Sequence, residues 1–386
     1  MTLSGSPECE ALRRVLTRFV TEEVIPLERE NSLTWDVAPP KALRKQVRLR
    51  SKALGLYGVD MPTEVGGGGM SFADCCLLEM DAHVHDTVFF QDLLGGGGGP
   101  TPVFLACTDE QKEKYLLPLI RGEVTTCFAL SEPEAGSDAT ALRTRAERKG
   151  DVFVLNGTKN IISNAVQADF AITFAVTDPA LGARGGITCF LVDNDAPGFS
   201  VGRAHTCMGF TGFQGELVFD ECEVAATNIL GHEGYGLLLA LDWINVNRVR
   251  TAAMCVGIAR RLLQTSAAYA TQRTQFGKAI ATYQAIQCKL ADIATELFAA
   301  ESMVHRTASM RDGGLDIRKA AAMTKLYSTE MVNRAAYEAI QIHGGVGCLK
   351  EMNVERVYRM VRIFTILEGT SEMQRLVIAG RLLNEA

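Results

Sequence analysis

The sequence predicts an α+β fold in three parts. They are a helical N-terminal domain (residues 1–122), a β domain, sandwich or barrel (123–230), and a C-terminal four-helix bundle (231–386). Apolar residues recur at helical spacing near both ends, whereas the middle carries short apolar runs bounded by turn residues. The length of 386 residues allows two or three domains that each bury a core.

The N-terminal part shows helical periodicity over Ala11 to Arg29 and again over Phe72 to His85. Thr108 is placed to cap a further helix, because the acids that follow it suit the positive end of a helix dipole.

The middle part changes to strand patterns. Val152 to Leu155 precedes Asn156-Gly157, a dipeptide that favours a hairpin turn. Further strands are expected over 170–176, 186–192 and 215–220. The C-terminal part returns to helical periodicity over 237–271, 283–311, 317–343 and 372–383, lengths that suit a bundle.

Composition excludes several classes of protein. Lys and Arg total 39 against 45 Asp and Glu, a net charge of -6, which argues against nucleic-acid binding. No segment reaches the ~20 apolar residues of a membrane helix, and Met1 to Glu10 lacks the features of a secretory signal. The 11 cysteines form no C-x-x-C pair, so we expect no metal site and a reducing cytoplasm.

Two segments of the β domain are candidates for ligand binding. Phe128 to Asp138 is a strand end that leads into a Gly-containing turn, where Ser131, Ser137 and backbone N–H groups are placed to meet a polar ligand. The alternative is an ordinary loop with side-chain turn bonds. Lys159 to Asn164 adds the hydroxyl of Ser163, and its alternative is a plain strand.

Two further candidates lie among the C-terminal helices. In the segment Arg273 to Lys278, Arg273 suits a phosphate and Phe276 a flat ring, unless Arg273 only caps a helix end. In Gln341 to Gly347, adjacent glycines allow close approach to a bulky partner, while His343 alone is more often structural.

The last candidate is Glu368, a carboxylate among apolar neighbours just before a glycine and the cap-like Thr370. An apolar site raises a carboxyl pKa towards the range of a general base. The alternative is a solvated loop acid beside an ordinary helix cap.

Together these five segments, in this order and spacing, resemble the acyl-CoA dehydrogenase family of flavoproteins. The resemblance covers nearly the whole chain and includes the segments 62–67, 110–118 and 231–236. It implies an FAD between the β domain and the bundle, partly bound by a neighbouring subunit, and hence a homo-oligomer (dimer or tetramer). The implied FAD-binding residues are Phe128, Leu130, Ser131, Ile161, Ser163, Arg273, Gln275, Phe276, Gln341, Gly345, Thr370 and Glu372.

The resemblance also implies the reaction. Glu368 would take the α-proton of an acyl-CoA while the β-hydrogen leaves as hydride to flavin N5, which gives a trans-2-enoyl thioester. The backbone N–H of Glu368 and the ribityl 2′-hydroxyl of FAD would polarise the carbonyl. Ser137, Asn245 and Arg248 would contact the substrate. Some family members place the base directly before the position of Arg248, where this chain has Asn247, which cannot act as one.

The chain departs from the family pattern at three positions. Ile161 stands where the family often has an aromatic residue that shields the flavin edge and helps electrons leave it. Its absence counts against an electron-transferring flavoprotein as the partner. Leu367 replaces a frequent Tyr, and Met360 an Asp between two arginines. Two alternatives stay open: an acyl-thioester dehydrogenase or oxidase of biosynthesis that acts on a carrier-bound group, and an inactive flavin-fold scaffold.

Overall fold

A computed structural model describes residues 4–385. Residues 1–3 and 386, the outermost positions of the expected first and last domains, lie outside the described residues. The chain folds into two compact units. We call residues 4–23, 71–87 and 245–385 the helical unit, and residues 24–70 and 88–244 the sheet unit. The domain boundaries expected at 122/123 and 230/231 stay predictions.

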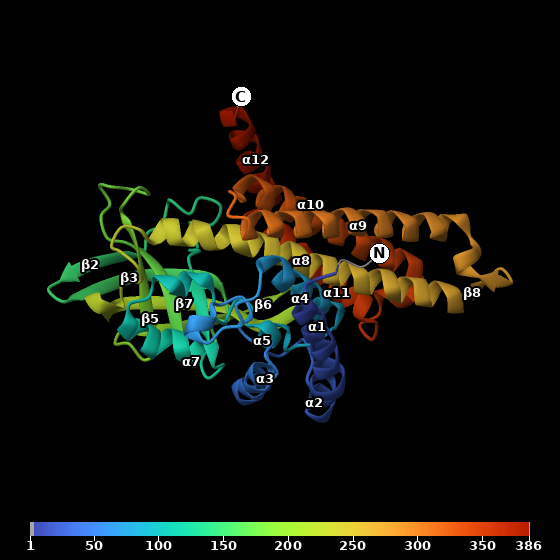
Figure 1. Ribbon diagram of the computed structural model, residues 1–386, viewed down its shortest axis with the longest axis horizontal. Coiled ribbons are helices and arrows are strands. Elements are labelled where there is room, and N and C mark those ends of the chain that lie inside the picture. Colours follow the sequence, from blue (N-terminus) through green and yellow to red (C-terminus); the bar gives the residue numbers. More distant parts are fainter. Residues whose placement is uncertain (1–3, 386) are drawn as a thin grey trace. The chain divides into compact units, whose positions relative to one another are not determined.

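Long helices make up the helical unit (Figure 1). α9 and α10 pack side by side, α10 also packs on α11 and α12, and α4 packs on α1 and α9. The helices expected between residues 237 and 383 are confirmed, with ends that shift by one or two residues. The bounds are α1 Pro7–Phe19, α4 Phe72–Val84, α8 Gly236–Gln272 (which starts in the sheet unit), α9 Gln284–Asp312, α10 Arg318–His343, α11 Asn353–Val361 and α12 Ser371–Glu385.

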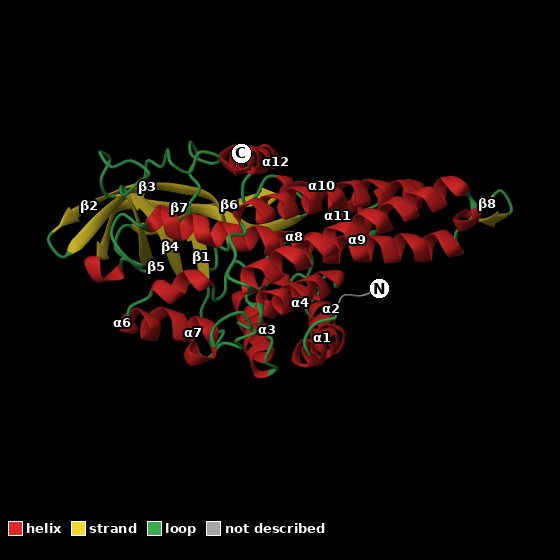
Figure 2. Cartoon of the chain, turned by 45° about the horizontal axis from the view of Figure 1, so that its top comes forward, coloured by secondary structure: helices red, strands yellow, loops and turns green. Residues whose placement is uncertain are grey.

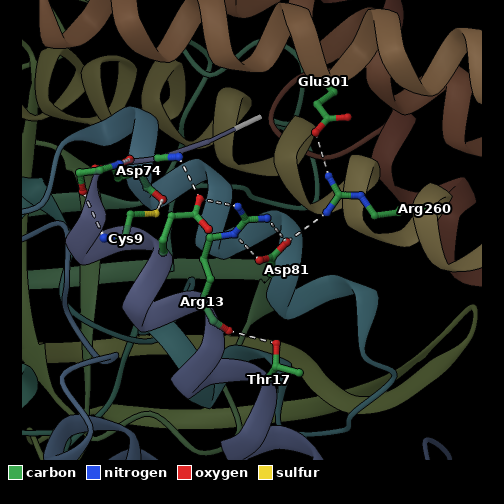
Figure 3. Close-up of polar contacts among 10 residues, drawn as sticks. Cys9, Arg13, Thr17, Asp74, Asp81, Arg260 and Glu301 are labelled. Atoms are coloured by element: carbon green, nitrogen blue, oxygen red, sulfur yellow. Dashed lines mark hydrogen bonds and ion pairs between the residues drawn. The ribbon is translucent and has the colours of Figure 1, made fainter. Parts of the chain in front are cut away.

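An ion network links four helices of this unit (Figure 3). Asp81 of α4 pairs with Arg13 of α1 at 2.6 Å and with Arg260 of α8 at 3.0 Å. Arg260 reaches on to Glu301 of α9 at 2.9 Å. All four side chains are largely buried, so the network fixes which faces of these helices meet.

The expected helix over Ala11 to Arg29 proves to be two helices. α1 ends at Phe19, the turn Val20–Val24 has the wider π-helical hydrogen bonding, and α2 starts at Ile25. Pro26 lies in the first turn of α2. Proline has no N–H to donate and crowds the carbonyl four residues earlier, so the regular ladder is interrupted.

A seven-stranded sheet forms the core of the sheet unit (Figure 2). Its order is β1-β4-β2-β3-β7-β6, with β5 paired to β4. β1 and β4 run parallel, whereas β3, β7 and β6 are antiparallel neighbours. The strands are β1 Thr126–Ala129, β2 Arg145–Lys149, β3 Val152–Ser163, β4 Phe170–Val176, β5 Ile187–Asp193, β6 Phe199–Cys207 and β7 Phe210–Ala225.

Short helices complete the sheet unit. Thr108 caps α6 as expected, because its hydroxyl accepts from the backbone of Gln111 and the Gln111 side chain accepts from the backbone of Thr108. The short helices are α2 Ile25–Glu30, α3 Lys41–Ala53, α5 Phe90–Leu94, α6 Asp109–Gln111 and α7 Leu117–Ile120.

The hairpin turn expected at Asn156-Gly157 is wrong. β3 continues through both residues, and a bulge shifts the register with β7 between Leu155 and Gly157. The side chain of Asn156 bonds across to Glu221 (2.8 and 2.9 Å), and a Cβ on Gly157 would lie 2.5 Å from Thr144 Oγ1. The Asn-Gly pair therefore serves a bulge in a crowded sheet.

Candidate active site

Glu368 lies in a left-handed turn directly before α12. Its φ is 57° and that of Gly369 is 88°, and a positive φ is uncommon for a residue with a side chain. Thr370 caps α12, since its hydroxyl accepts from the backbone of Met373 at 3.3 Å. Such strain persists only where surrounding contacts fix the turn.

Three side chains of the helical unit hold this turn through its carbonyls. Arg248 Nε of α8 donates to the Glu368 carbonyl at 3.2 Å, and Lys325 Nζ of α10 donates to the Gly369 carbonyl at 2.9 Å. Gln374 Nε2 of α12 donates to both carbonyls, at 3.0 and 2.8 Å. The position of the carboxyl is therefore set by three different helices.

The carboxyl of Glu368 accepts a hydrogen bond from Asn247 Nδ2 of α8 at 2.7 Å. Burial raises the pKa of Glu368, although the Asn247 bond and the charges of Arg248 and Lys325 act in the opposite direction. The residue is thus half-buried, and its carboxyl holds a proton more tightly than that of an ordinary glutamate, which favours a general base over a solvated loop acid.

Around this carboxyl lie two buried cations and an amide. Burial lowers the pKa of Lys325 to about 8 and also lowers that of Arg248. Arg248 Nη1 donates to Asn245 Oδ1 at 2.9 Å. The structure therefore brings Asn245 and Arg248, both expected to bind substrate, together with the expected base.

The first two candidate segments meet in the sheet unit. The backbone N–H of Asn160 donates to the Ser131 carbonyl at 2.9 Å, and Lys159 Nζ donates to the Leu130 carbonyl at 3.1 Å. Phe128 lies on β1 with its ring 4.8 Å from that of Phe174. The loop after β1 and the end of β3 thus form one surface.

Ile161 is exposed on this surface with a φ of 58° at a second bulge of β3. The residue is 65% exposed. A positive φ is unusual for a β-branched residue. Asn160 Oδ1 accepts the Ile161 N–H at 2.8 Å and so fixes this conformation. Ser163 and Ser137 are exposed as well.

The third segment forms a hairpin between α8 and α9, built from β8 (Thr274–Gln275) and β9 (Lys278–Ala279). Its two turn residues both have positive φ, 50° at Phe276 and 81° at Gly277, as a tight two-residue hairpin requires. Phe276 is 93% exposed, and Arg273 and Gln275 are also exposed. Gly277 therefore serves the hairpin turn and not a helix cap.

The fourth segment ends α10 near the base of that hairpin. His343 stacks on Tyr269 of α8 at 4.4 Å and bonds to the Ala339 carbonyl at 2.7 Å, contacts that favour a structural role. Gln341 and Gly345 are exposed, and a Cβ on Gly345 would meet no atom within 4 Å. Lys325 and Gln341 are 16 residues apart on α10, or ~24 Å, so the hairpin lies far from Glu368.

Sequence reasoning missed the partners of Glu368. The family pattern marks Asn247 only as a position that cannot hold a base, and it assigns no role to Lys325 or Gln374. A possible signal for Lys325 is its place as a lone charge among the small residues of a helix interior. For the other two, only the fold reveals the contact.

The exposed groups fit a large flat ligand with phosphates such as FAD. Arg273 offers a guanidinium for phosphate, Phe276 an aromatic face, and the open glycines allow close approach of a backbone. Glu372 is exposed in the first turn of α12, where its pKa is lowered by hydrogen bonds to its own backbone and to Thr370.

Comparison with known proteins shows the family. Models of the N-terminal, middle and C-terminal domains of acyl-CoA dehydrogenases match residues 6–123, 127–222 and 234–383. The chain belongs to the acyl-CoA dehydrogenase family and is an oxidoreductase with the expected helical, β and helical order.

Similar proteins carry names of both dehydrogenases and reductases. The chain is 39% identical to a 3-(aryl)acrylate reductase of Clostridium sporogenes (97% of this chain, 98% of the relative). It is 37% identical to an acyl-CoA dehydrogenase of Bacillus subtilis (96% and 97%). It is 40% identical to the subunit CarC of a caffeyl-CoA reductase-Etf complex of Acetobacterium woodii (86% and 88%).

The fold also matches solved structures. An FAD complex of PigA superposes with a TM-score of 0.91 at 26% identity over 100% of both chains. In the described part of the chain, no helix is both long and apolar enough to span a membrane.

Proposed function

We propose that this chain dehydrogenates the Cα–Cβ bond of an acyl-CoA to the trans-2-enoyl thioester, with Glu368 as general base. The enclosed carboxyl of Glu368, with its raised pKa, carries the proposal. A base is most effective when its pKa approaches the working pH.

The same turn offers a donor for the thioester carbonyl. Within the described helical unit, the backbone N–H of Glu368 donates no hydrogen bond, and the left-handed turn holds it in place. A fixed N–H stabilises the negative charge that develops on the carbonyl oxygen as the α-proton leaves. Asn245 and Arg248 are proposed to line the acyl thioester, and Ser137 to bind the chain beyond it.

A bound FAD would supply the acceptor for the β-hydrogen, which would leave the substrate as a hydride. We expect the surface of Phe128, Leu130, Ser131, Ile161 and Ser163 to hold its ring system, and Thr370 and Glu372 to lie near its diphosphate. Arg273, Gln275, Phe276, Gln341 and Gly345 are proposed to bind the FAD of a neighbouring subunit, which agrees with their distance from Glu368. Arg273→Ala is then expected to weaken FAD retention in a homo-oligomer.

The reverse reaction is a second candidate. Two relatives are named reductases of an aryl acrylate and of caffeyl-CoA. In that direction protonated Glu368 returns a proton to the α-carbon of an enoyl thioester. The raised pKa supports this role equally, because the carboxyl holds its proton more tightly than an ordinary glutamate does. The Etf complex of the second relative supports an electron-transferring flavoprotein as partner.

One experiment tests the base and the direction. The wild-type holoprotein is mixed without oxygen with acyl-CoAs of graded length, and the loss of flavin absorbance is followed. The dithionite-reduced protein is mixed with enoyl-CoAs, including caffeyl-CoA, and the recovery of absorbance is followed. Glu368→Gln is expected to slow both by at least ~100-fold, whereas the exposed control Glu351→Gln leaves them unchanged. Rapid bleaching of Glu368→Gln would refute the assignment.

The remaining alternatives predict other outcomes. A carrier-protein substrate predicts bleaching by acyl carrier protein thioesters and not by acyl-CoAs, and an oxidase predicts peroxide release in air. An inactive scaffold predicts a colourless protein that gains no flavin band with added FAD. A cytoplasmic location is proposed because all 11 cysteines are free.

A further inference from the structure

We propose that Asn247 is the positioning residue of the base: its side-chain amide holds one oxygen of Glu368 and leaves the other oxygen to exchange the proton. The inference rests on the proposed function of Glu368. The observation that carries it is the 2.7 Å bond from Asn247 Nδ2 to Glu368 Oε1.

The two carboxylate oxygens have different surroundings. Oε1 accepts the Asn247 bond, whereas Oε2 accepts no hydrogen bond from the described residues of the helical unit. An amide nitrogen only donates, so this contact cannot take up a proton. A proton that arrives from substrate therefore binds at Oε2, and the amide prevents the carboxyl from rotating away.

The neighbouring cations do not take over this task. Arg248 Nε on α8 donates a hydrogen bond to the Glu368 carbonyl, and Lys325 Nζ on α10 donates one to the Gly369 carbonyl. Cys255 and Glu330 are the further titratable groups that act on Lys325. Both cations act on the carboxyl by charge alone, so Asn247 is the single side chain of the described helical unit that donates to it.

A neutral donor at this position suits a base better than a charged one. A direct ion pair would stabilise the ionised form strongly and weaken the carboxylate as a base. An amide fixes the orientation and stabilises the anion only by one hydrogen bond. The group stays both oriented and basic.

The test measures the protonation of Glu368 directly. In the FAD-loaded protein, the carboxylic C=O stretch that disappears in Glu368→Gln is titrated by infrared difference spectroscopy. Asn247→Leu removes the donor at similar volume, and Asn247→Asp replaces it with an acceptor that carries charge. The exposed Asn353→Asp at the start of α11 is the matched control.

We expect the pKa of Glu368 to rise in Asn247→Leu by up to about one unit, the equivalent of one hydrogen bond. Asn247→Asp is expected to raise it further, because a second negative charge disfavours ionisation. The alkaline shift should also appear in the pH profile of flavin reduction. Asn353→Asp should change neither.

Two outcomes separate the possible failures. An unchanged C=O titration in both Asn247 variants would overturn the positioning role, even if activity fell, because a general structural defect does not act on one carboxyl. Full turnover by Glu368→Gln would instead refute the proposed function, and the infrared result would still show whether Asn247 acts on the carboxyl.

Discussion

Each unit contains a glutamate enclosed together with a lysine, and the two arrangements shift the carboxyl pKa in opposite directions. In the sheet unit, Glu132 accepts Lys159 Nζ at 2.7 Å and the backbone N–H groups of Arg143 and Thr144. Burial acts to raise the pKa of Glu132, but the charge and hydrogen bonds of Lys159 and the two backbone bonds outweigh it and leave the pKa lowered.

In the helical unit, Lys325 is just as buried but gives its Nζ to a backbone carbonyl and not to the carboxyl of Glu368. Burial is then the larger effect, and the pKa of Glu368 is raised. The comparison shows that the atom to which a lysine donates, more than its presence, decides whether a buried carboxyl is a structural anion or a base.

The largest effect should come from Lys159→Met. It leaves the Glu132 carboxylate buried without its cation, and removal of one partner of such a pair costs ~3–5 kcal/mol. Urea unfolding measures the loss. Lys149→Met, on neighbouring β2 with an exposed side chain, is the matched control and should cost at most ~1 kcal/mol. Equal urea midpoints for the two variants would contradict the view that Lys159 stabilises the buried Glu132 carboxylate.

The same Glu→Gln change should have opposite effects on stability at the two sites. A lowered folded pKa makes ionised Glu132 stabilising above its unfolded pKa, and this stability is lost as pH falls through the folded pKa. Folded Glu368 binds its proton more tightly, so ionisation costs stability once pH rises above the unfolded pKa.

At pH 7, therefore, Glu132→Gln is expected to lower the melting temperature and Glu368→Gln to raise it. The gain of Glu368→Gln should vanish at acidic pH, where the wild-type carboxyl is protonated in both states. Calorimetric scans of both variants against pH check the signs. A loss of stability in Glu368→Gln at neutral pH would show that the base is a structural anion after all.

A smaller effect is expected from Lys325→Met. It removes a nearby positive charge and the bond to the Gly369 carbonyl, so the pKa of Glu368 should rise further and flavin reduction should shift to higher pH. We expect a fall of roughly tenfold in the reduction rate below the shifted pKa. The exposed Lys350→Met serves as control; a pH profile unchanged by Lys325→Met would exclude the electrostatic role.

The smallest effect should come from Arg260→Met in the network of Figure 3. This arginine pairs with Asp81 and Glu301 while part of it still reaches solvent, so we expect a loss of about 1–2 kcal/mol in unfolding experiments. The titration of Glu368 should not move. A shift in the pKa of Glu368 in this variant would mean that the ion network affects the base across the helical unit.

The sequence alone determined the helices of the bundle, the strand character of the middle region and the family. These features depend on local periodicity and on spacing along the chain, as the close agreement of α8, α9 and α10 shows. Local sequence patterns gave wrong predictions where contacts with other parts of the chain set the backbone conformation. Asn156-Gly157 forms a bulge in β3 beside β7, in space that Thr144 crowds. Pro26 divides a helix that the periodicity predicts to be continuous.

Glu368 itself was predicted from its apolar flanks and its family motif. Its contacts with Asn247, Lys325 and Gln374 were not, because they join α8, α10 and α12 across as many as 121 residues of sequence. Lys325 donates to a backbone carbonyl and Lys159 to a carboxylate. These acceptors come within reach only after the helices and strands have packed. A pKa depends on which atoms lie within a few ångströms, so only the tertiary structure decides it.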